Sequence, residues 1–210
     1  MSVGRFITLE GIEGAGKSTV ARYVADRLTE QGITVRLTRE PGGTPLAERV
    51  RQIVLERGTE QVSAVTETLL MFAARALHVE NVIGPALRAG QWVVCDRFTD
   101  ATRAYQGSGR GVDAALIDTL ARAVHPQIAP DCTLLLDLPA AAGLLRARAR
   151  SGGGADRFEA ETVSFFERVR AGYLALARRE PARIQVIDAA APLGEVQQQV
   201  AGILAGLPRP

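Results

Sequence analysis

Residues 11–18 read Gly-Ile-Glu-Gly-Ala-Gly-Lys-Ser, the complete pattern of a phosphate-binding loop. Its glycines let backbone N–H groups turn inward around phosphate oxygens, where a Cβ would obstruct the approach. Lys17 supplies a positive charge and Ser18 a hydroxyl for Mg²⁺. An apolar run precedes the loop and an amphipathic helix pattern follows it. This context predicts a nucleotide-phosphate site and not an ordinary glycine-rich turn.

Two carboxylates stand close to this phosphate loop. Glu10 comes directly before the loop and Glu13 lies within it. A negative charge beside polyphosphate needs a cation between them, so Glu13 is expected to face Mg²⁺ or an arginine, unless it is simply exposed to solvent. Further along, Arg39 and Glu40 precede a Pro-Gly-Gly turn that would hold both in place. A surface ion pair beside a turn would also explain that segment.

Another apolar run ends in Asp96 and is followed at once by Arg97. An aspartate at a strand end near a phosphate loop is the Walker B arrangement, in which the carboxylate reaches Mg²⁺ directly or through water. The planar guanidinium of Arg97 suits a second phosphate, one that belongs to an acceptor and not to ATP. An ion pair at a strand end is the alternative interpretation.

Two further segments could contact a nucleotide. Phe72 and Arg75 stand three residues apart in a helical pattern, so a ring and a guanidinium share one face and could read a nucleobase. An aromatic residue on a helix is, however, more often part of the core. Between 102 and 111, Tyr105 and Gln106 offer polar groups in a glycine-rich segment that could bend around a nucleotide or form a flexible surface loop.

A basic segment runs from 146 to 157, where arginines at 146, 148 and 150 precede three consecutive glycines and Arg157. Hinged arginines are what a lid needs to bring positive charge onto a phosphoryl group, an effect of about 10³–10⁵ in rate for an arginine finger. A helix C-terminus stabilised by positive charge, followed by a loop, is the alternative.

The elements that must position these residues follow from the apolar pattern. Short, nearly continuous apolar runs predict strands covered on both faces, as in a parallel sheet, at 6–10, 34–38, 92–96, 133–138 and 184–188. Helical patterns fill the intervals, at 17–31, 45–57, 63–89, 113–124, 140–150, 159–180 and 193–206. This alternation predicts an α/β fold with right-handed crossovers. The motifs that follow the strands should therefore meet at the carboxyl edge of the sheet.

Composition limits the remaining possibilities. The 210 residues, 47% of them hydrophobic, suit one domain spanning 1–210. A net charge of +2 with scattered basic residues argues against a nucleic-acid partner and favours small phosphorylated ligands. We expect a cytoplasmic protein with no membrane partner, because no signal pattern and no apolar stretch of about 20 residues is found. Cys95 and Cys132 lie in predicted strands, where they are expected to be packing residues.

Together these motifs resemble those of the bacterial thymidylate kinases, a family of nucleoside monophosphate kinases. The similarity runs along essentially the whole chain. Its markers are the loop 11–18, the stretch 38–44, Met71-Phe72-Ala73-Ala74-Arg75, Asp96-Arg97, the segments 104–107 and 109–111, and Asp156-Arg157-Phe158-Glu159. The resemblance implies a P-loop NTPase fold, a five-stranded parallel sheet flanked by helices, with a mobile lid at about 146–158. It also implies transfer of the γ-phosphoryl group of MgATP to dTMP, giving dTDP, by a protein that is usually a homodimer.

The resemblance assigns roles to the matching residues. The ATP-binding positions would be Gly11, Ile12, Glu13, Gly14, Ala15, Gly16, Lys17, Ser18 and Thr19, and the Mg²⁺ positions Ser18 and Asp96. Arg97 would bind the acceptor phosphate, while Phe72 would stack on thymine and Arg75 would bond its carbonyl edge. The rest of the acceptor pocket would be Thr102, Tyr105, Gln106, Glu10 and Glu40. Catalysis would rest on Lys17, Arg97 and the lid residue Arg150, with Arg148 and Arg157 as alternatives to Arg150.

Two other activities stay open on the residues alone: phosphorylation of UMP, CMP or AMP, and a nucleotide-dependent switch of the GTPase kind. The polar and aromatic groups at 72–75 and 105–106 favour a pyrimidine. The chain lacks the N-K-x-D string with which a GTPase reads guanine. No general base is expected, since a nucleotide phosphate is already an anionic nucleophile, and neither His78 nor His125 is expected to be catalytic. Phe98 departs from relatives, which often carry Tyr or His there.

Overall fold

The computed structural model describes residues 4–56, 60–151, 157–158 and 161–207, with the backbone alone at Arg150 and Ser151. Five parallel strands form one sheet in the order β2-β3-β1-β4-β5. Their bounds are β1 (Phe6–Glu10), β2 (Val35–Arg39), β3 (Trp92–Asp96), β4 (Cys132–Asp137) and β5 (Ile184–Asp188). Each predicted strand is present, within one residue of its predicted ends. The central position of β1 puts the phosphate loop in the middle of the carboxyl edge of the sheet.

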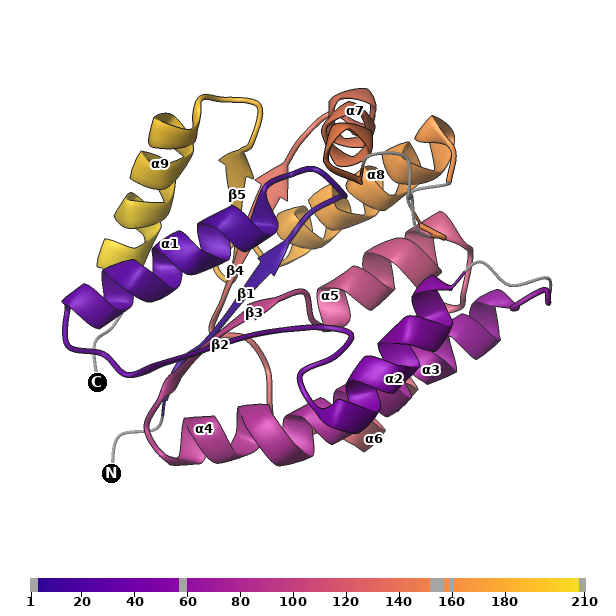
Figure 1. Cartoon of the computed structure of the whole chain (residues 1–210), viewed down its shortest axis with the longest axis horizontal. Coiled ribbons are helices and arrows are strands. Elements are labelled where there is room, and N and C mark those ends of the chain that lie inside the picture. Colours follow the sequence, from indigo (N-terminus) through magenta and orange to yellow (C-terminus); the bar gives the residue numbers. More distant parts are fainter. Residues whose placement is uncertain (1–3, 57–59, 152–156, 159–160, 208–210) are drawn as a thin grey trace.

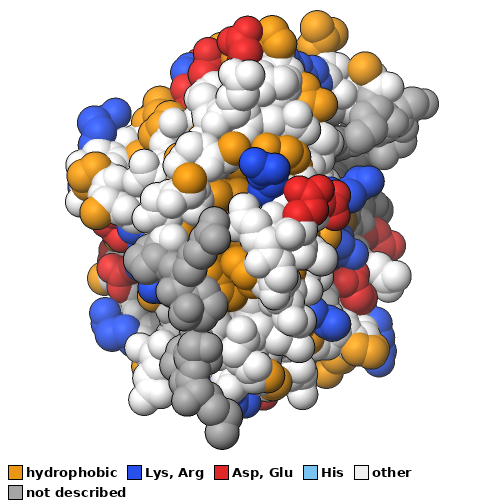
Figure 2. Space-filling model, turned by 90° about the vertical axis from the view of Figure 1, so that its left-hand side faces the viewer, with side chains coloured by type: hydrophobic (Ala, Val, Ile, Leu, Met, Phe, Trp, Pro, Cys, Tyr) orange, Lys and Arg blue, Asp and Glu red, His pale blue; other side chains and the backbone are white. Residues whose placement is uncertain are grey.

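Helices cover both faces of this sheet (Figure 1). The described elements are α1 (Lys17–Glu30), α2 (Pro45–Leu55), α3 (Ala64–His78), α4 (Gly84–Arg88), α5 (Thr99–Thr102), α6 (Ala114–Val124), α7 (Ala140–Ser151), α8 (Val163–Arg179) and α9 (Leu193–Ala205), with π-helical segments η1 (Val79–Ile83) and η2 (Arg103–Gly109). None of these helices is long and apolar enough to cross a membrane. On the face of the molecule in Figure 2, acidic and basic side chains occur in small separate groups and do not gather by sign.

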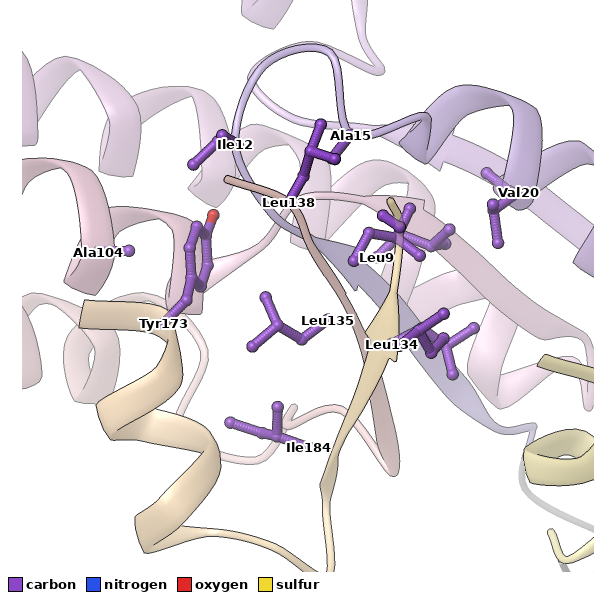
Figure 3. Packing of buried hydrophobic residues seen from close by; sticks show 14 of the residues in the cluster. Leu9, Ile12, Ala15, Val20, Ala104, Leu134, Leu135, Leu138, Tyr173 and Ile184 are labelled. Atoms are coloured by element: carbon purple, nitrogen blue, oxygen red, sulfur yellow. The ribbon is translucent and has the colours of Figure 1, made fainter. Parts of the chain in front are cut away.

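Successive side chains of the buried strands point to opposite faces, as strand geometry requires. Ile7 and Leu9 of β1 belong to the core cluster that includes Val24 of α1. Phe6 and its β3 partner Val93 belong to a second cluster with η1 and α4. Below the phosphate loop, Figure 3 shows the side chains of the first cluster packed between the strands and Tyr173 of α8. A core on both faces fixes the strand ends from which the site is built.

The predicted helix 63–89 is present as α3, η1 and α4 in continuous succession. The widened turn of η1 lies immediately before Gly84-Pro85, and the Gly84 N–H bonds to the carbonyl of Val79, five residues back. Proline cannot donate a helical hydrogen bond and its ring crowds the carbonyl four residues earlier, which accounts for the irregular turn at this point. Gly90 follows the end of this run at φ 77°, a backbone conformation that glycine adopts readily.

The segment 102–111 is not the bent or flexible loop that its glycines suggested. It forms the end of α5 and then η2, and Tyr105 and Gln106 within it are buried. Gly109 is needed for packing, because a Cβ there would lie 2.7 Å from Phe165 Cε2 of α8. The close approach to α8 explains why a glycine-rich sequence holds a helical form here.

Candidate functional site

The phosphate loop connects β1 to α1, and its glycines serve two purposes. Gly14 has φ 76° and lies so close to α7 that a Cβ would be 2.1 Å from the carbonyl oxygen of Gly143. Gly16 has φ 91° but nothing within 4 Å of where its Cβ would be. Gly16 is also the N-cap of α1 and, as a glycine, has no side chain with which to cap that end of the helix. The first N–H groups of a helix have no partner within that helix, and this makes the start of α1 a position that can bind phosphate.

Lys17 points back over this loop. Its Nζ donates to the carbonyl oxygens of Gly11 at 3.0 Å and Ile12 at 2.8 Å, and only 8% of the residue is exposed. Burial, assisted by the nearby charge of Arg97, lowers the pKa of Lys17 to about 8.

Ser18 and Asp96 meet although 78 residues separate them. The Oγ of Ser18 donates to Oδ2 of Asp96 at 2.9 Å, because β3 lies beside β1 and Asp96 is its last residue. A hydroxyl and a carboxylate side by side are hard oxygen ligands that suit Mg²⁺. No group of three or more His, Cys, Asp or Glu that could hold a metal ion occurs within the part of the chain that the structure covers.

Arg97 follows Asp96 in a left-handed conformation, with φ 74°. Its Nη2 donates to Oε1 of Glu13 at 2.8 Å and to the hydroxyl of Tyr105 at 3.1 Å. The same Tyr105 hydroxyl donates to Oε2 of Glu13 at 2.5 Å. Of the interpretations offered for Glu13, the structure shows the one in which it faces an arginine. The ion pair that Arg97 makes is with Glu13 of the phosphate loop, whereas the neighbouring Asp96 bonds Ser18.

Glu40 and Arg75 form a buried ion pair, with Nε of Arg75 2.7 Å from Oε2 of Glu40 and both side chains 3% exposed. His78 Nδ1 lies 3.0 Å from the other oxygen of Glu40. Burial favours a raised pKa for Glu40, but the charge of Arg75 and the hydrogen bond to His78 hold that pKa below its usual value. The surface ion pair considered for this segment is made by Arg39, which bonds Glu48.

One of the three guanidinium nitrogens of Arg75 makes no hydrogen bond to the described residues. Its Nη2 donates to the carbonyl oxygen of Phe98 and to Oγ1 of Thr102, both at 3.1 Å. Its Nη1 is buried and has no hydrogen-bond partner among the described residues. A buried guanidinium N–H without a partner is unfavourable, so this position suits a ligand that carries an acceptor.

These groups surround one cavity of about 250 Å³ at the carboxyl edge of the sheet. Its walls are the phosphate loop and α1, the ends of β2 and β3, and the helices α2, α3, α5 and η2. The lining residues are Glu13, Gly14, Gly16, Lys17, Ser18, Thr19, Arg39, Glu40, Pro41, Arg51, Leu55, Met71, Arg75, Asp96, Arg97, Ala101, Thr102, Tyr105, Gln106 and Phe158. The cavity joins a phosphate cradle to a second, partly apolar compartment, as two bound nucleotides would require.

Comparison of the chain with known proteins shows the family to which it belongs. The family model described as thymidylate kinase matches residues 9–200. This chain belongs to the thymidylate kinase family. It is 56% identical over 202 residues to a thymidylate kinase of Pseudomonas putida, covering 96% of this chain and 97% of that one. It is 55% identical to a thymidylate kinase of Methylococcus capsulatus, covering 98% and 99%.

A solved structure supports the same assignment. The crystal structure of thymidylate kinase from Ehrlichia chaffeensis matches with a TM-score of 0.78 at 35% identity, covering 96% of this chain and 99% of that one. The predicted P-loop NTPase fold and the predicted family are confirmed. The chain is accordingly an enzyme, a kinase that phosphorylates dTMP to dTDP with ATP.

Within this thymidylate kinase site, several predicted residues lie behind the cavity wall. Ile12 and Ala15 are core residues beneath the loop (Figure 3), and Gly11 does not line the cavity. Glu10 is also buried outside the cavity, where Oε2 accepts from the Tyr173 hydroxyl at 2.7 Å and Oε1 from the Phe98 N–H at 2.8 Å. Burial, reinforced by the charge of Asp100, raises the pKa of Glu10 to about 8.

The base-stacking role expected of Phe72 stays a prediction, and the centroid of its ring lies 4.7 Å from the guanidinium carbon of Arg75. Phe72 is 2% exposed, packs with Val112, Ile117 and Ala121, and does not line the cavity. Met71, one residue earlier, does line it together with Arg75. Met71 and Arg75 are four residues apart, a spacing that puts both on one helical face as effectively as the three-residue spacing of Phe72 and Arg75. Helical spacing alone therefore allows either Met71 or Phe72 to lie beside a ligand held by Arg75.

The arginines predicted for the lid differ in whether the structure describes them and in what they contact. The side chain of Arg150 and residues 152–156 lie outside the described residues. Arg157 does not line the cavity, since its guanidinium binds Glu67 and the carbonyl oxygen of Val54. Arg51 was not predicted, yet it lines the cavity from α2 and donates to the carbonyl oxygen of Pro41 at 3.1 Å. An arginine in the middle of a helix carries no motif that would single it out.

Proposed function

We propose that dTMP and MgATP occupy the two compartments of this one cavity and that the phosphoryl group passes between them beside Arg97. The observation that carries the proposal is the continuity of the cavity from Gly16 and Lys17, at the phosphate loop, to Arg75 and Gln106, at the far wall. Arg97 lines the same cavity and follows β3, the strand that pairs with β1. One compartment then holds the donor and the other the acceptor.

On the donor side, the residues 11–19 supply backbone N–H groups and Lys17 supplies charge. The N-terminus of α1 adds the positive end of a 14-residue helix. Ser18 and Asp96 would hold Mg²⁺, whose bound charge offsets that of the triphosphate. Arg150 is proposed as the lid residue that adds positive charge to the phosphoryl group in transfer, and the lid as the segment at about 146–158.

On the acceptor side, Arg97 would bind the phosphate of dTMP with the planar fork of its guanidinium. Arg75 would donate from its free Nη1 to a carbonyl of thymine, which gives that buried N–H the partner it lacks. We propose Met71, in place of Phe72, as the apolar surface beside the base, and Thr102, Tyr105 and Gln106 as the rest of the pocket. Glu40 would act through Arg75, which it orients.

The mechanism needs positioning more than covalent chemistry. The dTMP phosphate is an anionic nucleophile, so the protein must hold two phosphates in line and neutralise their repulsion. Lys17, Arg97 and Arg150 would share that work, and none of them needs to accept a proton.

We propose a homodimer formed through the outer faces of α2 and α3. Large apolar side chains are exposed there, Leu46 and Ile53 seven residues apart on α2 and Val65 and Leu69 four residues apart on α3. These spacings put each pair on one side of its helix, and α2 and α3 pack against each other. Exposed apolar faces of this kind favour association. Sedimentation of the wild-type protein and of Ile53→Glu at equal concentration would test it, with a shift to monomer expected for the variant.

The function is tested by coupled release of ADP with dTMP, dUMP, UMP and AMP at equal concentration, where dTMP should be preferred and a preference for AMP would overturn the proposal. The residue roles are tested by two variants. Arg97→Ala should raise the KM for dTMP, whereas Arg150→Ala should chiefly lower kcat. Small, equal effects of both variants would contradict this division of roles.

A further inference from the structure

Glu67 is a buried carboxylate that the proposed mechanism does not use. It lies in the first turn of α3 and is 1% exposed. Its Oε1 accepts from Gln106 Nε2 at 2.7 Å and from Arg110 Nε at 2.8 Å, and its Oε2 binds Arg157. A carboxylate held by two guanidinium groups acts only as a hydrogen-bond acceptor.

This property fixes the amide of Gln106. A glutamine amide has an NH₂ group that donates and an oxygen that accepts, so only Nε2 can face Glu67. Gln106 is 1% exposed and lines the acceptor compartment of the cavity. With one N–H of Nε2 bound to Glu67, Oε1 points away from that contact and is the one acceptor of this amide.

Arg75 lines the same cavity, and its buried Nη1 is a donor with no partner among the described residues. A donor and an acceptor together match the edge of a keto pyrimidine such as thymine, which carries an accepting carbonyl at C4 and a donating N–H at N3. Cytosine has the reverse pattern, with a donating amino group at C4 and an accepting nitrogen at N3. Cytosine would therefore place donor against donor and acceptor against acceptor.

We propose that Glu67 is a positioning residue that sets base selectivity, by holding the Gln106 amide in the orientation that accepts a keto pyrimidine and rejects cytosine. The inference rests on the proposed function, since it places the base of dTMP in this compartment. Glu67 does not line the cavity and acts through Gln106, while Arg110 and Arg157 hold the carboxylate in place.

The test compares kcat/KM for dTMP and dCMP in the wild-type enzyme and in Glu67→Gln. A glutamine at 67 can donate or accept, so Gln106 gains the second orientation, and the dTMP:dCMP ratio should fall at least about tenfold. This ratio does not depend on the fraction of enzyme that is folded. Glu161→Gln is the matched control: it removes the other carboxylate that binds Arg110, 2.9 Å away, and should leave the ratio unchanged.

Two more variants separate positioning from a purely structural role. Glu67→Asp keeps an acceptor-only group and should keep the ratio even where turnover falls. In a Gln106→Leu background, which should itself lose selectivity, Glu67→Gln should lower the ratio no further. The inference would be overturned if active Glu67→Gln kept the wild-type dTMP:dCMP ratio. It would also be overturned if Glu67→Gln lowered this ratio equally in the wild-type and the Gln106→Leu backgrounds. If Glu67→Gln does not fold, either of two other results would overturn the inference. One is a dTMP:dCMP ratio that falls in Glu67→Asp, and the other is a wild-type ratio in Gln106→Leu. Absence of dTMP phosphorylation in the wild type would instead overturn the proposed function.

Discussion

The carboxylate of Glu13 in the phosphate loop lies 2.8 Å from Nη2 of Arg97, the residue proposed to bind the acceptor phosphate. Tyr105 completes the contact with a hydrogen bond to each of the two side chains. Both charged side chains are largely shielded from water, at 17% and 15% exposure. A phosphate that binds Arg97 must therefore share the guanidinium with a fixed negative charge or displace it.

The variant Glu13→Gln should bind dTMP more tightly than the wild type, by about three- to tenfold, because it removes a negative charge near the phosphate while retaining the size of the side chain. Calorimetric titration measures the effect. Thymidine, which lacks the phosphate, is the matched ligand, and its affinity should not change. Weaker binding of dTMP, or an equal change for both ligands, would show that Glu13 does not compete with the phosphate.

The placement of Met71 and Phe72 gives a prediction that separates the two residues. Met71→Ala should raise the KM for dTMP about tenfold with a small change in the free energy of unfolding, since its side chain lines the cavity. Phe72→Leu should lower the free energy of unfolding by about 1 kcal/mol or more, because it leaves space in a packed cluster, and should change KM little. Urea denaturation and steady-state kinetics on both variants decide it. A raised KM for Phe72→Leu, together with an unchanged KM for Met71→Ala, would support base stacking by Phe72.

These two residues also show what the sequence could and could not predict. The strand ends were predictable, since continuous apolar runs define strands and the parallel arrangement brings Ser18 and Asp96 together. The face of α3 that lines the cavity was not predictable. Phe72 and Met71, three and four positions before Arg75, both lie on its side of the helix, and only the packing of α3 against α6 decides which of them is buried.

The helical conformation of residues 103–109 could not be predicted from the sequence, because it also depends on packing against another element. Its glycines argue against a helix in isolation, and the contact that compensates for them is made with α8, far along the chain. The unpaired Nη1 of Arg75 and the links from Glu67 to Gln106 depend on three-dimensional contacts and leave no trace in residue spacing.

Lys17 should make ATP binding depend on pH. Its pKa is lowered to about 8 in the free protein, so the amine loses its proton as pH rises above that value. ATP favours the charged amine, and binding at higher pH must then take up a proton. Calorimetry in buffers of different ionisation enthalpy should show proton uptake that rises toward about one per ATP between pH 7 and 9. Zero uptake at pH 9 would mean that Lys17 remains charged without nucleotide.

Glu10 should make folding stability depend on pH in the opposite sense to an ordinary carboxylate. Its pKa is about 8 in the folded chain against 4.5 for an unperturbed side chain, so the folded state retains a proton that the unfolded state has lost. The contribution of this group to stability is complete below about pH 4.5 and declines as pH rises toward 8. Glu10→Gln cannot ionise, so its free energy of unfolding relative to the wild type should increase with pH, by on the order of 1 kcal/mol per unit between pH 5 and 7. Urea denaturation at several pH values measures this difference, and a difference independent of pH would show that Glu10 is already ionised in the folded protein, held by the donors Tyr173 and Phe98 N–H.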